Sequence, residues 1–460
     1  MEPLQNSIWR DSLANLMQNS DIAYGRSRFF GTEKIHPATI IFLLFSSPTF
    51  LFHPIFMPSP LRCETVKLTD MIYLDNNATT EVDPEVVKEM LPFLTTHYGN
   101  PSSPYHFGKQ AAEALGLARE RLASFLGCAA RELIFTSCGT EANNAAILSA
   151  LQVNPDRRHI VTTAIEHSSI IKLCETLSRK GYGVSYVPVD ARGQVDLQAL
   201  SDAIRQDTAI VSAMWANNET GTVLPIPEIA KIASEKNVLF HTDAVQVIGK
   251  MPVNLSEMGV HFLSLSGHKL HAPKGIGALY INRRTRFIPM LPGSQESGKR
   301  AGTENVAGIV ALGKAAELAG KYIDIELSEV KAMRDRFESE IFQRVSGVQM
   351  NGDPENRLPN TVNFSFHGVE GEGLLMMLDR RGICCSTGSA CTTGALAPSH
   401  VLKAMGLSNS AARGSLRFSF SRMNAKGDVD VVFEALSEVV ETLRTLSATP
   451  EKVARQAVAL

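Results

Sequence analysis

Residues 241–246 read His-Thr-Asp-Ala-Val-Gln, and residues 264–269 read Ser-Leu-Ser-Gly-His-Lys. Each stretch contains the end of a short apolar run of the kind that forms a buried β-strand. The carboxylate of Asp243 follows the first run, and the amine of Lys269 follows the second. In an open α/β sheet, ligands bind beyond the carboxyl ends of the strands. The two stretches therefore predict an α/β fold with a ligand site that contains Asp243 and Lys269.

Strand-like and helix-like segments alternate on both sides of these stretches. Strands are predicted at 133–136, 159–163, 209–215, 238–242, 260–266 and 277–281, and helices at 141–151, 168–180 and 226–236. Such alternation indicates a mostly parallel sheet covered by helices on both faces. We therefore assign residues 80–325 to one large α/β domain.

A second, smaller domain is predicted toward the C-terminus. A charged helical stretch at 313–344 precedes strands at 361–366, 382–385 and 416–419 and a closing helix at 429–446. This mixture of elements is typical of an α+β unit. We predict that the smaller domain consists of residues 71–79 together with 326–460.

The first seventy residues differ from the rest of the chain. Residues 38–57 are rich in Phe, Leu and Ile, but Pro48, His53 and Pro54 interrupt the run. A bilayer-spanning helix needs about 20 predominantly apolar residues, so a membrane anchor is the less favoured interpretation. We predict that residues 1–70 are an extension outside the fold, which begins at Met71, and we expect no membrane association.

The composition excludes several classes of protein. The chain has 460 residues, with 45 Lys and Arg against 47 Asp and Glu, a formal net charge of −2. A nucleic-acid-binding protein normally carries a strongly basic surface, so no direct nucleic-acid partner is expected. Seven cysteines, an odd number spread over a long chain, do not suggest a secreted disulfide framework. The sequence favours a reducing, cytoplasmic location.

Four polar groups are predicted at the carboxyl ends of the strands. They are Gly139-Thr140 at the start of a helix, Asn217–Gly221 in a turn, Asp243 with Gln246, and Gly267-His268-Lys269. Taken singly, each has an ordinary explanation as a turn, a helix cap or a surface charge. Together they suit pyridoxal 5'-phosphate (PLP), which needs a Lys for a Schiff base, an Asp beside its pyridinium nitrogen and an anchored phosphate.

The order of these motifs resembles the class V aminotransferase family, and more narrowly the cysteine desulfurases of the NifS/IscS type. The resemblance covers about residues 71–445 and implies a fold-type I PLP-dependent transferase. Such a protein has a large domain with a mostly parallel seven-stranded sheet and a smaller α+β domain. The other matching motifs are Tyr73-Leu-Asp-Asn-Asn-Ala-Thr-Thr80, Tyr98-Gly-Asn-Pro-Ser-Ser103, Asn217-Asn-Glu-Thr-Gly221, Lys274-Gly-Ile-Gly-Ala278, Arg300-Ala-Gly-Thr-Glu-Asn305 and Gly388-Ser-Ala-Cys391.

The resemblance also implies a role for individual residues. Lys269 would bind PLP covalently and move the substrate's α-proton, and His167 would stack on the ring and assist. Arg417 would bind the substrate carboxylate, although Arg413 is close enough in sequence to compete for this role. Asn217 would contact the substrate as well as the cofactor. The remaining cofactor contacts would be Asp243, Gln246 and Asn217 at the ring, and Gly139, Thr140, Ser266, His268 and, from the partner subunit of a homodimer, Thr303 at the phosphate.

Cys391 separates a desulfurase from an aminotransferase. It lies among small residues in Gly388-Ser-Ala-Cys391-Thr-Thr-Gly, which cannot pack a core and suit an accessible, reactive thiol. The resemblance implies that Cys391 takes sulfur from L-cysteine as a persulfide and leaves L-alanine. The sulfur would then pass to an iron–sulfur scaffold or a thio-cofactor pathway, with a transient iron contact at Cys391.

Three departures from the family pattern, and two alternative functions, remain. Cys384 and Cys385 stand where Ala, Val or Ser is usual, Cys138 replaces Gly or Ala, and Ala397 replaces Glu.

One alternative function is that of another PLP enzyme of the same fold, a selenocysteine lyase or an alanine-type aminotransferase. The other is a non-catalytic interaction protein, which loss of Lys269 or Asp243 would have favoured, yet both residues are present.

Overall fold

The computed structural model describes residues 71–387 and 398–457, with side chains described as far as residue 446. These residues belong to one compact unit, Thr65–Leu460. The predicted extension, residues 1–70, lies outside the described residues. Within the described part of the chain, no helix is both long enough and apolar enough to cross a membrane.

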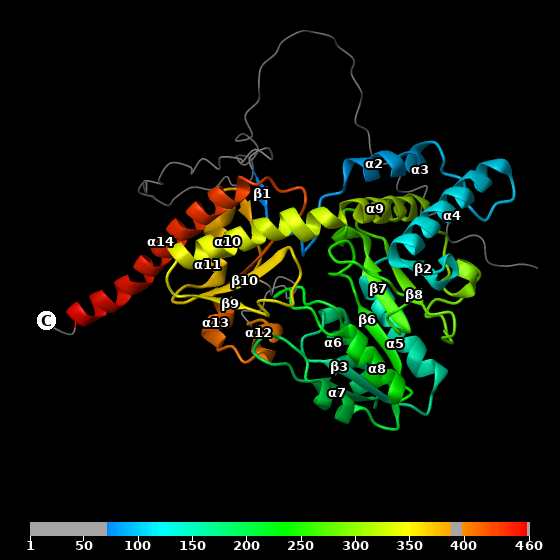
Figure 1. Ribbon diagram of the computed structural model, residues 1–460, viewed down its shortest axis with the longest axis horizontal. Helices are drawn as coiled ribbons and strands as arrows, with labels where there is room; N and C mark the ends of the chain where they lie inside the picture. Colours follow the sequence, from blue (N-terminus) through cyan, green and yellow to red (C-terminus); the bar gives the residue numbers. More distant parts are fainter. Residues whose placement is uncertain (1–70, 388–397, 458–460) are drawn as a thin grey trace, which may run out of the picture. The chain divides into compact units, whose positions relative to one another are not determined.

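A seven-stranded sheet forms the centre of the large domain (Figure 1). All neighbouring strands are parallel except β8, which is antiparallel to both β2 and β7. Strands β2, β7, β6 and β5 therefore point the same way, and their carboxyl ends share one edge. The predicted mostly parallel sheet is confirmed. Across the sheet the order is β2 (Leu133–Thr136), β8 (Gly277–Ile281), β7 (Phe262–Ser266), β6 (Leu239–Asp243), β5 (Thr208–Met214), β3 (His159–Thr163) and β4 (Gly183–Val187).

Helices cover both faces of this sheet because both faces are apolar. Ile160 and Val161 are neighbours in β3 and belong to two different buried clusters, since successive strand residues point to opposite faces. Helices α4 and α9 lie side by side (Figure 1), and a Cβ atom on Gly313 of α9 would lie only 2.5 Å from the Cα atom of Ala118. The helices are α2 (Pro84–Met90), α3 (Pro92–Thr95), α4 (His106–Leu126), α5 (Gly139–Val153), α6 (Ser168–Arg179), α7 (Leu197–Ala203), α8 (Ile226–Glu235) and α9 (Val306–Ile325).

The smaller domain has its own sheets and its own core. Phe337 packs edge-to-face against Phe418 with ring centroids 4.9 Å apart, and Leu74 is buried in the same cluster. This core therefore joins the start of the fold to its C-terminal part. The predicted bounds of the smaller domain, residues 71–79 with 326–460, stay a prediction. Its strands are β12 (Ser415–Ser419), β10 (Thr361–Phe366) and β9 (Val348–Asn351), all antiparallel, and the parallel pair β1 (Ile72–Tyr73) and β11 (Ile383–Cys384). Its helices include α10 (Lys331–Arg344), α11 (Gly371–Asp379) and α14 (Asp428–Ala457).

Two local features differ from the predicted organisation. The single helical stretch predicted at 313–344 consists of α9 and α10 joined by one π-helical turn, Glu326–Val330. The segment with α12 (His400–Ala404) and α13 (Asn409–Arg413) packs on the large domain, because Val401 and Leu402 are buried in the cluster that contains the sheet residues. This segment thus connects the two domains.

Candidate active site

A cavity of about 320 Å³ opens at the shared carboxyl edge of the sheet. It is lined by residues that follow strands β2, β6 and β7, by the N-terminal segment around Asn77, and by Ser386 and Arg417 from the smaller domain. The cavity therefore lies where α/β sheets place their ligands. Nine of the predicted site residues line it: Gly139, Thr140, His167, Asp243, Gln246, Ser266, His268, Lys269 and Arg417.

Lys269 ends a single 3-10 turn, Gly267–Lys269, that directly follows β7. The turn is tight because a Cβ atom on Gly267 would lie 2.9 Å from the side chain of Ile276. The Lys269 Nζ atom donates hydrogen bonds to the carbonyl oxygens of Asn77, at 2.5 Å, and Ala78, at 2.7 Å. The amine is thus held at the cavity wall by the segment 77–78.

Asp243 is the last residue of β6 and is only 5% exposed. Its Oδ1 atom accepts from the backbone amide of Val245 at 3.0 Å, and its Oδ2 atom accepts from the Asn143 side chain at 2.7 Å. Asn143 also donates to the Ser169 hydroxyl at 3.0 Å. The carboxylate is therefore fixed in orientation at the cavity, as a partner for a protonated ring nitrogen requires.

The start of α5 has the features of a phosphate site. The N-terminal amides of a helix bind anions, and the N-cap residue here, Cys138, makes no side-chain cap. Gly139 lets the start of the helix pack closely against Val245, because a Cβ atom at this position would lie only 2.7 Å from a Val245 methyl group. The Ser266 hydroxyl is buried at the cavity and has no hydrogen-bond partner. An unpartnered buried hydroxyl beside an uncapped helix start fits a phosphate group.

His268 and His167 add two imidazoles to the lining. Burial and the nearby charge of Lys269 lower the pKa of His268 to about 4. Burial also lowers the pKa of His167, which caps α6: its Nδ1 atom accepts from the Ser169 amide at 3.2 Å. Because Nδ1 is the acceptor, the neutral ring carries its hydrogen on Nε2. His167 is therefore both the N-cap of α6 and a residue of the cavity lining.

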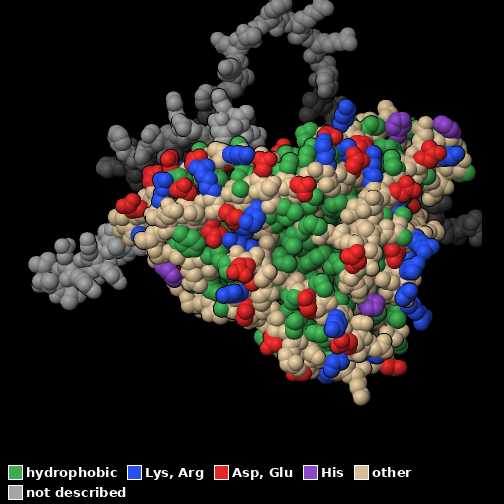
Figure 2. All heavy atoms as spheres, in the orientation of Figure 1, with side chains coloured by type: hydrophobic (Ala, Val, Ile, Leu, Met, Phe, Trp, Pro, Cys, Tyr) green, Lys and Arg blue, Asp and Glu red, His purple; other side chains and the backbone are tan. Residues whose placement is uncertain are grey.

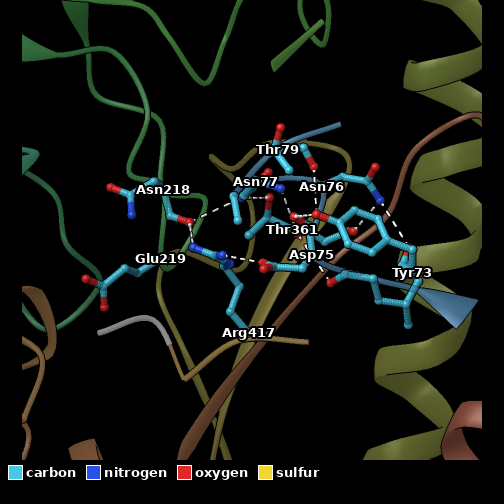
Figure 3. Close-up of polar contacts among 12 residues, drawn as sticks. Tyr73, Asp75, Asn76, Asn77, Thr79, Asn218, Glu219, Thr361 and Arg417 are labelled. Carbon is cyan, nitrogen blue, oxygen red and sulfur yellow. Dashed lines mark hydrogen bonds and ion pairs between the residues drawn. The ribbon is translucent and has the colours of Figure 1, made fainter. Parts of the chain in front are cut away.

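Arg417 brings a guanidinium group to the wall of the cavity. It is 4% exposed on β12, and its Nη atoms donate to the Asp75 carboxylate at 2.5 Å and to the Asn218 carbonyl at 2.9 Å (Figure 3). Its buried Nε atom has no partner. Arg413, which the sequence left as a competitor, is exposed at the end of α13 and does not line the cavity.

Two predicted cofactor contacts do not line the cavity within one chain. Asn217 is fully buried, and its Oδ1 atom accepts from the amides of Glu219 and Thr220 at 2.9 and 3.0 Å, so this side chain shapes its own turn. Asn218 lines the cavity in its place. Thr303 is exposed and lines a separate pocket with Arg300. The predicted roles of Asn217 and Thr303 stay predictions.

Cys391 and Ala397 lie outside the described residues, but the ends of their segment are described. On one side, Ser386 pairs with Arg417 through two backbone hydrogen bonds of 3.1 and 2.7 Å. On the other, the Ser399 hydroxyl donates to the buried Glu219 carboxylate at 2.5 Å. Among the described residues, no group of three or more His, Cys, Asp or Glu side chains could hold a metal ion.

Several residues in the cavity or next to it were not predicted. Asn77 and Ala78 accept from Lys269, Asn143 orients Asp243, and Asp75 pairs with Arg417. Three of these four lie in the quoted motif at 73–80, to which no role had been given. The motif at 73–80 could therefore have indicated that these three residues belong to the site, whereas nothing in the local sequence indicates a role for Asn143.

The comparisons with known proteins agree with this geometry. The aminotransferase class-V family matches residues 72–432, and the chain belongs to that family, within its cysteine desulfurase branch. A cysteine desulfurase of Trichormus azollae is 51% identical over 378 residues, which are 82% of this chain and 94% of that protein. The cysteine desulfurase NifS of Azotobacter vinelandii is 50% identical, again over 82% of this chain and 94% of its own length.

Solved structures give the same family. A NifS-like protein has a TM-score of 0.76 at 37% identity, covering 81% of this chain and 100% of its own. The predicted fold, a fold-type I transferase with a mostly parallel seven-stranded sheet, is confirmed. Enzymes of this family depend on PLP. The cofactor predicted from the motifs is therefore confirmed at the level of the family, and the donor groups of the cavity fit it.

Proposed function

We propose that this chain is a cysteine desulfurase that converts L-cysteine to L-alanine and retains the sulfur as a persulfide on Cys391. The observation that carries the proposal is the convergence of Lys269, Asp243 and the unpartnered Ser266 hydroxyl in one cavity. Relatives about 50% identical over nearly their whole length are cysteine desulfurases, which favours this reaction over amino transfer.

PLP bound in this cavity would supply an electron sink for the carbon atoms of the substrate amino acid. Lys269 would hold the cofactor, and its amine would then take the proton from the substrate's α-carbon. Asp243 would pair with the ring nitrogen and keep it protonated. Ser266, His268 and the backbone amides that begin with Gly139 and Thr140 would bind the phosphate.

The substrate is bound by its carboxylate. Arg417 has a buried Nε atom without a partner, and it offers that edge to a planar anion. Asp75 and the Asn218 carbonyl hold the other edge, so the guanidinium keeps its orientation before the substrate arrives. His167, with its hydrogen on Nε2, would stack on the cofactor ring and assist proton transfer, and Gln246, in the turn after β6, would contact the ring.

Sulfur leaves through Cys391. Its thiolate attacks the substrate sulfur, a sulfur–sulfur bond forms, and the bond between that sulfur and the substrate's β-carbon breaks. The electron pair of the broken bond stays with the carbon, which takes up a proton and becomes the methyl group of L-alanine. The persulfide then passes its outer sulfur to an acceptor, an iron–sulfur scaffold or another carrier, and any iron contact at Cys391 belongs to that transfer.

The direct test uses purified protein with PLP. We expect a yellow protein that releases alanine from L-cysteine, and sulfide when a thiol reductant is present. L-selenocysteine and a 2-oxo acid acceptor serve as comparison substrates. Turnover of L-selenocysteine alone would favour the lyase, and amino transfer without sulfide would favour the aminotransferase. A colourless protein that does not bind PLP would contradict the proposal.

A cytoplasmic homodimer is the second part of the proposal. Leu94 lies in α3 and Tyr98 lies shortly after the end of that helix, and these side chains are 60% and 74% exposed. Figure 2 shows hydrophobic side chains gathered over the large domain. Such exposed apolar groups are typical of interaction surfaces. The five described cysteines are free, as expected in a reducing compartment.

Thr303 provides a test of the dimer. If it binds the phosphate in the partner's cavity, Thr303→Ala should weaken PLP affinity about ten- to a hundredfold, since a hydrogen bond to a charged group is worth about 1.5–3 kcal/mol. Mixed dimers of Thr303→Ala and Lys269→Ala subunits should regain one site of wild-type affinity, because only that site has both residues. Mixed dimers in which no site regains this affinity would show that Thr303 acts within its own chain. Unchanged PLP affinity in the Thr303→Ala homodimer would show that Thr303 does not contact the phosphate.

A further inference from the structure

Asn77 is almost completely buried, with 1% of its surface exposed, and it makes hydrogen bonds to both domains. Its backbone amide donates to the Ser419 hydroxyl at 2.9 Å, and its backbone carbonyl accepts from Lys269 Nζ at 2.5 Å. Its side-chain nitrogen donates to the Thr361 hydroxyl at 2.8 Å and to the Asn218 carbonyl at 3.2 Å (Figure 3). These contacts fix both the backbone and the side chain of Asn77.

The side-chain oxygen of Asn77 joins the two domains in the same way. It accepts from Lys250 Nζ of the large domain at 2.9 Å, and from the Asn360 side chain, next to β10 of the smaller domain, at 3.2 Å. Buried polar groups that lose a partner pay the cost of desolvation without compensation. Asn77 therefore holds the segment 77–78 at one position between the domains.

The Lys269 amine is held by this segment. Its Nζ atom donates to the carbonyl oxygens of Asn77 and Ala78, at 2.5 and 2.7 Å. An unprotonated primary amine has two hydrogens, so both can be donated to these two carbonyls. The lone pair, which attacks a carbonyl carbon, then points away from the segment 77–78. The position of the two carbonyl groups thus sets the direction in which the Lys269 amine can react.

The same asparagine is linked to Arg417. The Asn218 carbonyl, which accepts from the Asn77 side chain, also accepts from Arg417 Nη1 at 2.9 Å (Figure 3). A carbonyl oxygen has two lone pairs and can accept both hydrogen bonds. Asn77 is therefore bonded directly to Lys269 and, through one shared carbonyl, to Arg417.

We propose that Asn77 is a positioning residue that fixes the Lys269 amine and the Arg417 guanidinium relative to each other. The amine reacts at one end of an amino-acid substrate, and the guanidinium binds the carboxylate at the other. A bound substrate reacts fast only if both groups are held in the right geometry. This inference rests on the proposed function, in which Lys269 binds the cofactor and Arg417 binds the substrate carboxylate.

The test makes two measurements that need no turnover: the rate at which PLP adds to the apoprotein, and the affinity of the PLP-loaded protein for L-alanine, from the visible spectrum. Asn77→Ala should impair both by about tenfold or more, because several buried groups lose a partner. Thr361→Val keeps the shape of the side chain but removes the hydroxyl that holds Asn77. It should slow PLP addition and weaken L-alanine binding, each about two- to tenfold, as expected for one buried hydrogen bond.

Thr361→Ser should restore both values toward those of the wild-type protein, since it keeps the hydroxyl and loses only a methyl group. Thr162→Val is the matched control, because Thr162 is also buried in a strand but its hydroxyl has no hydrogen-bond partner among the described residues. Both measurements should be unchanged in this control. Circular dichroism checks folding, and if Asn77→Ala does not fold, the two Thr361 variants decide.

A purely structural role would make Thr361→Ser, which loses a buried methyl group, as harmful as Thr361→Val, and that result would overturn the proposal. A change in only one of the two measurements in Thr361→Val would contradict the link between Lys269 and Arg417. Failure of the wild-type protein to bind PLP at Lys269, shown by borohydride reduction and peptide mapping, would instead refute the proposed function.

Discussion

Lys269→Ala is expected to abolish alanine formation from L-cysteine and to prevent covalent binding of PLP. The variant loses the amine that binds the cofactor and also the base that moves the α-proton. Positioned acid–base groups alone contribute about a hundred- to ten-thousandfold, so a fall of more than about a thousandfold is expected. Lys250 is also buried, but its Nζ atom is bound to the side chains of Asn77 and Gln246 and does not line the cavity, so Lys250 does not replace Lys269.

Borohydride reduction followed by peptide mapping measures this prediction. In the wild-type protein the reduced cofactor should be found on the peptide that contains Lys269, and in the variant on no peptide. Lys231→Ala is the matched control, since Lys231 is exposed on α8 and should leave labelling and rate unchanged. Reduced label on another lysine of the wild-type protein would contradict the assignment.

Cys391→Ser is expected to retain PLP and bind L-cysteine while losing alanine formation and persulfide. A free thiol has a pKa of about 8.5, so a few per cent is thiolate at neutral pH, whereas a serine hydroxyl does not ionise there. Lys269, Asp243 and Arg417 are untouched, so the visible spectrum should still respond to L-cysteine. Stopped-flow absorbance and alanine analysis separate the two steps.

Cys384→Ser is the control for this variant. Cys384 lies on the short strand β11, where burial and the carboxylates of Asp379 and Asp75 raise its pKa, which disfavours the thiolate. Most of the activity should therefore remain in this variant. Cys385 is a less suitable control because it is buried in the small-domain core, where a hydroxyl group would disturb packing. Near-native activity of Cys391→Ser would refute the proposed sulfur transfer.

Sequence patterns predicted the buried strands well. The predicted limits of β2, β3, β8 and β10 agree with the structure, because each is a short run in which every residue is buried. Strand β4 was not predicted, since most of its residues are only partly buried and no strong apolar run marks it. Helix α4 was also missed: its buried face is made largely of Gly and Ala, such as Gly108, Ala111 and Ala118, which give a weak hydrophobic pattern.

The site was predictable where it follows strand ends and not where distant segments meet. Asp243 and Lys269 are adjacent to their strands in sequence, and both line the cavity as predicted. The contact between Asn77 and Lys269 joins residues 192 positions apart, and that between Asp75 and Arg417 joins residues 342 apart. Such pairs depend on how the N-terminal segment crosses both domains, and no local pattern specifies that path.

The most direct test of the central claim is a single-turnover experiment on the PLP-loaded protein with one equivalent of L-cysteine and no reductant or acceptor. Mass spectrometry then locates any added sulfur, and amino-acid analysis counts the alanine. The proposed function predicts one alanine for each added sulfur atom, with all of that sulfur on the peptide that contains Cys391. Alanine formed without added sulfur, or sulfur on Cys384 or Cys385 in a Cys391→Ser protein, would contradict it.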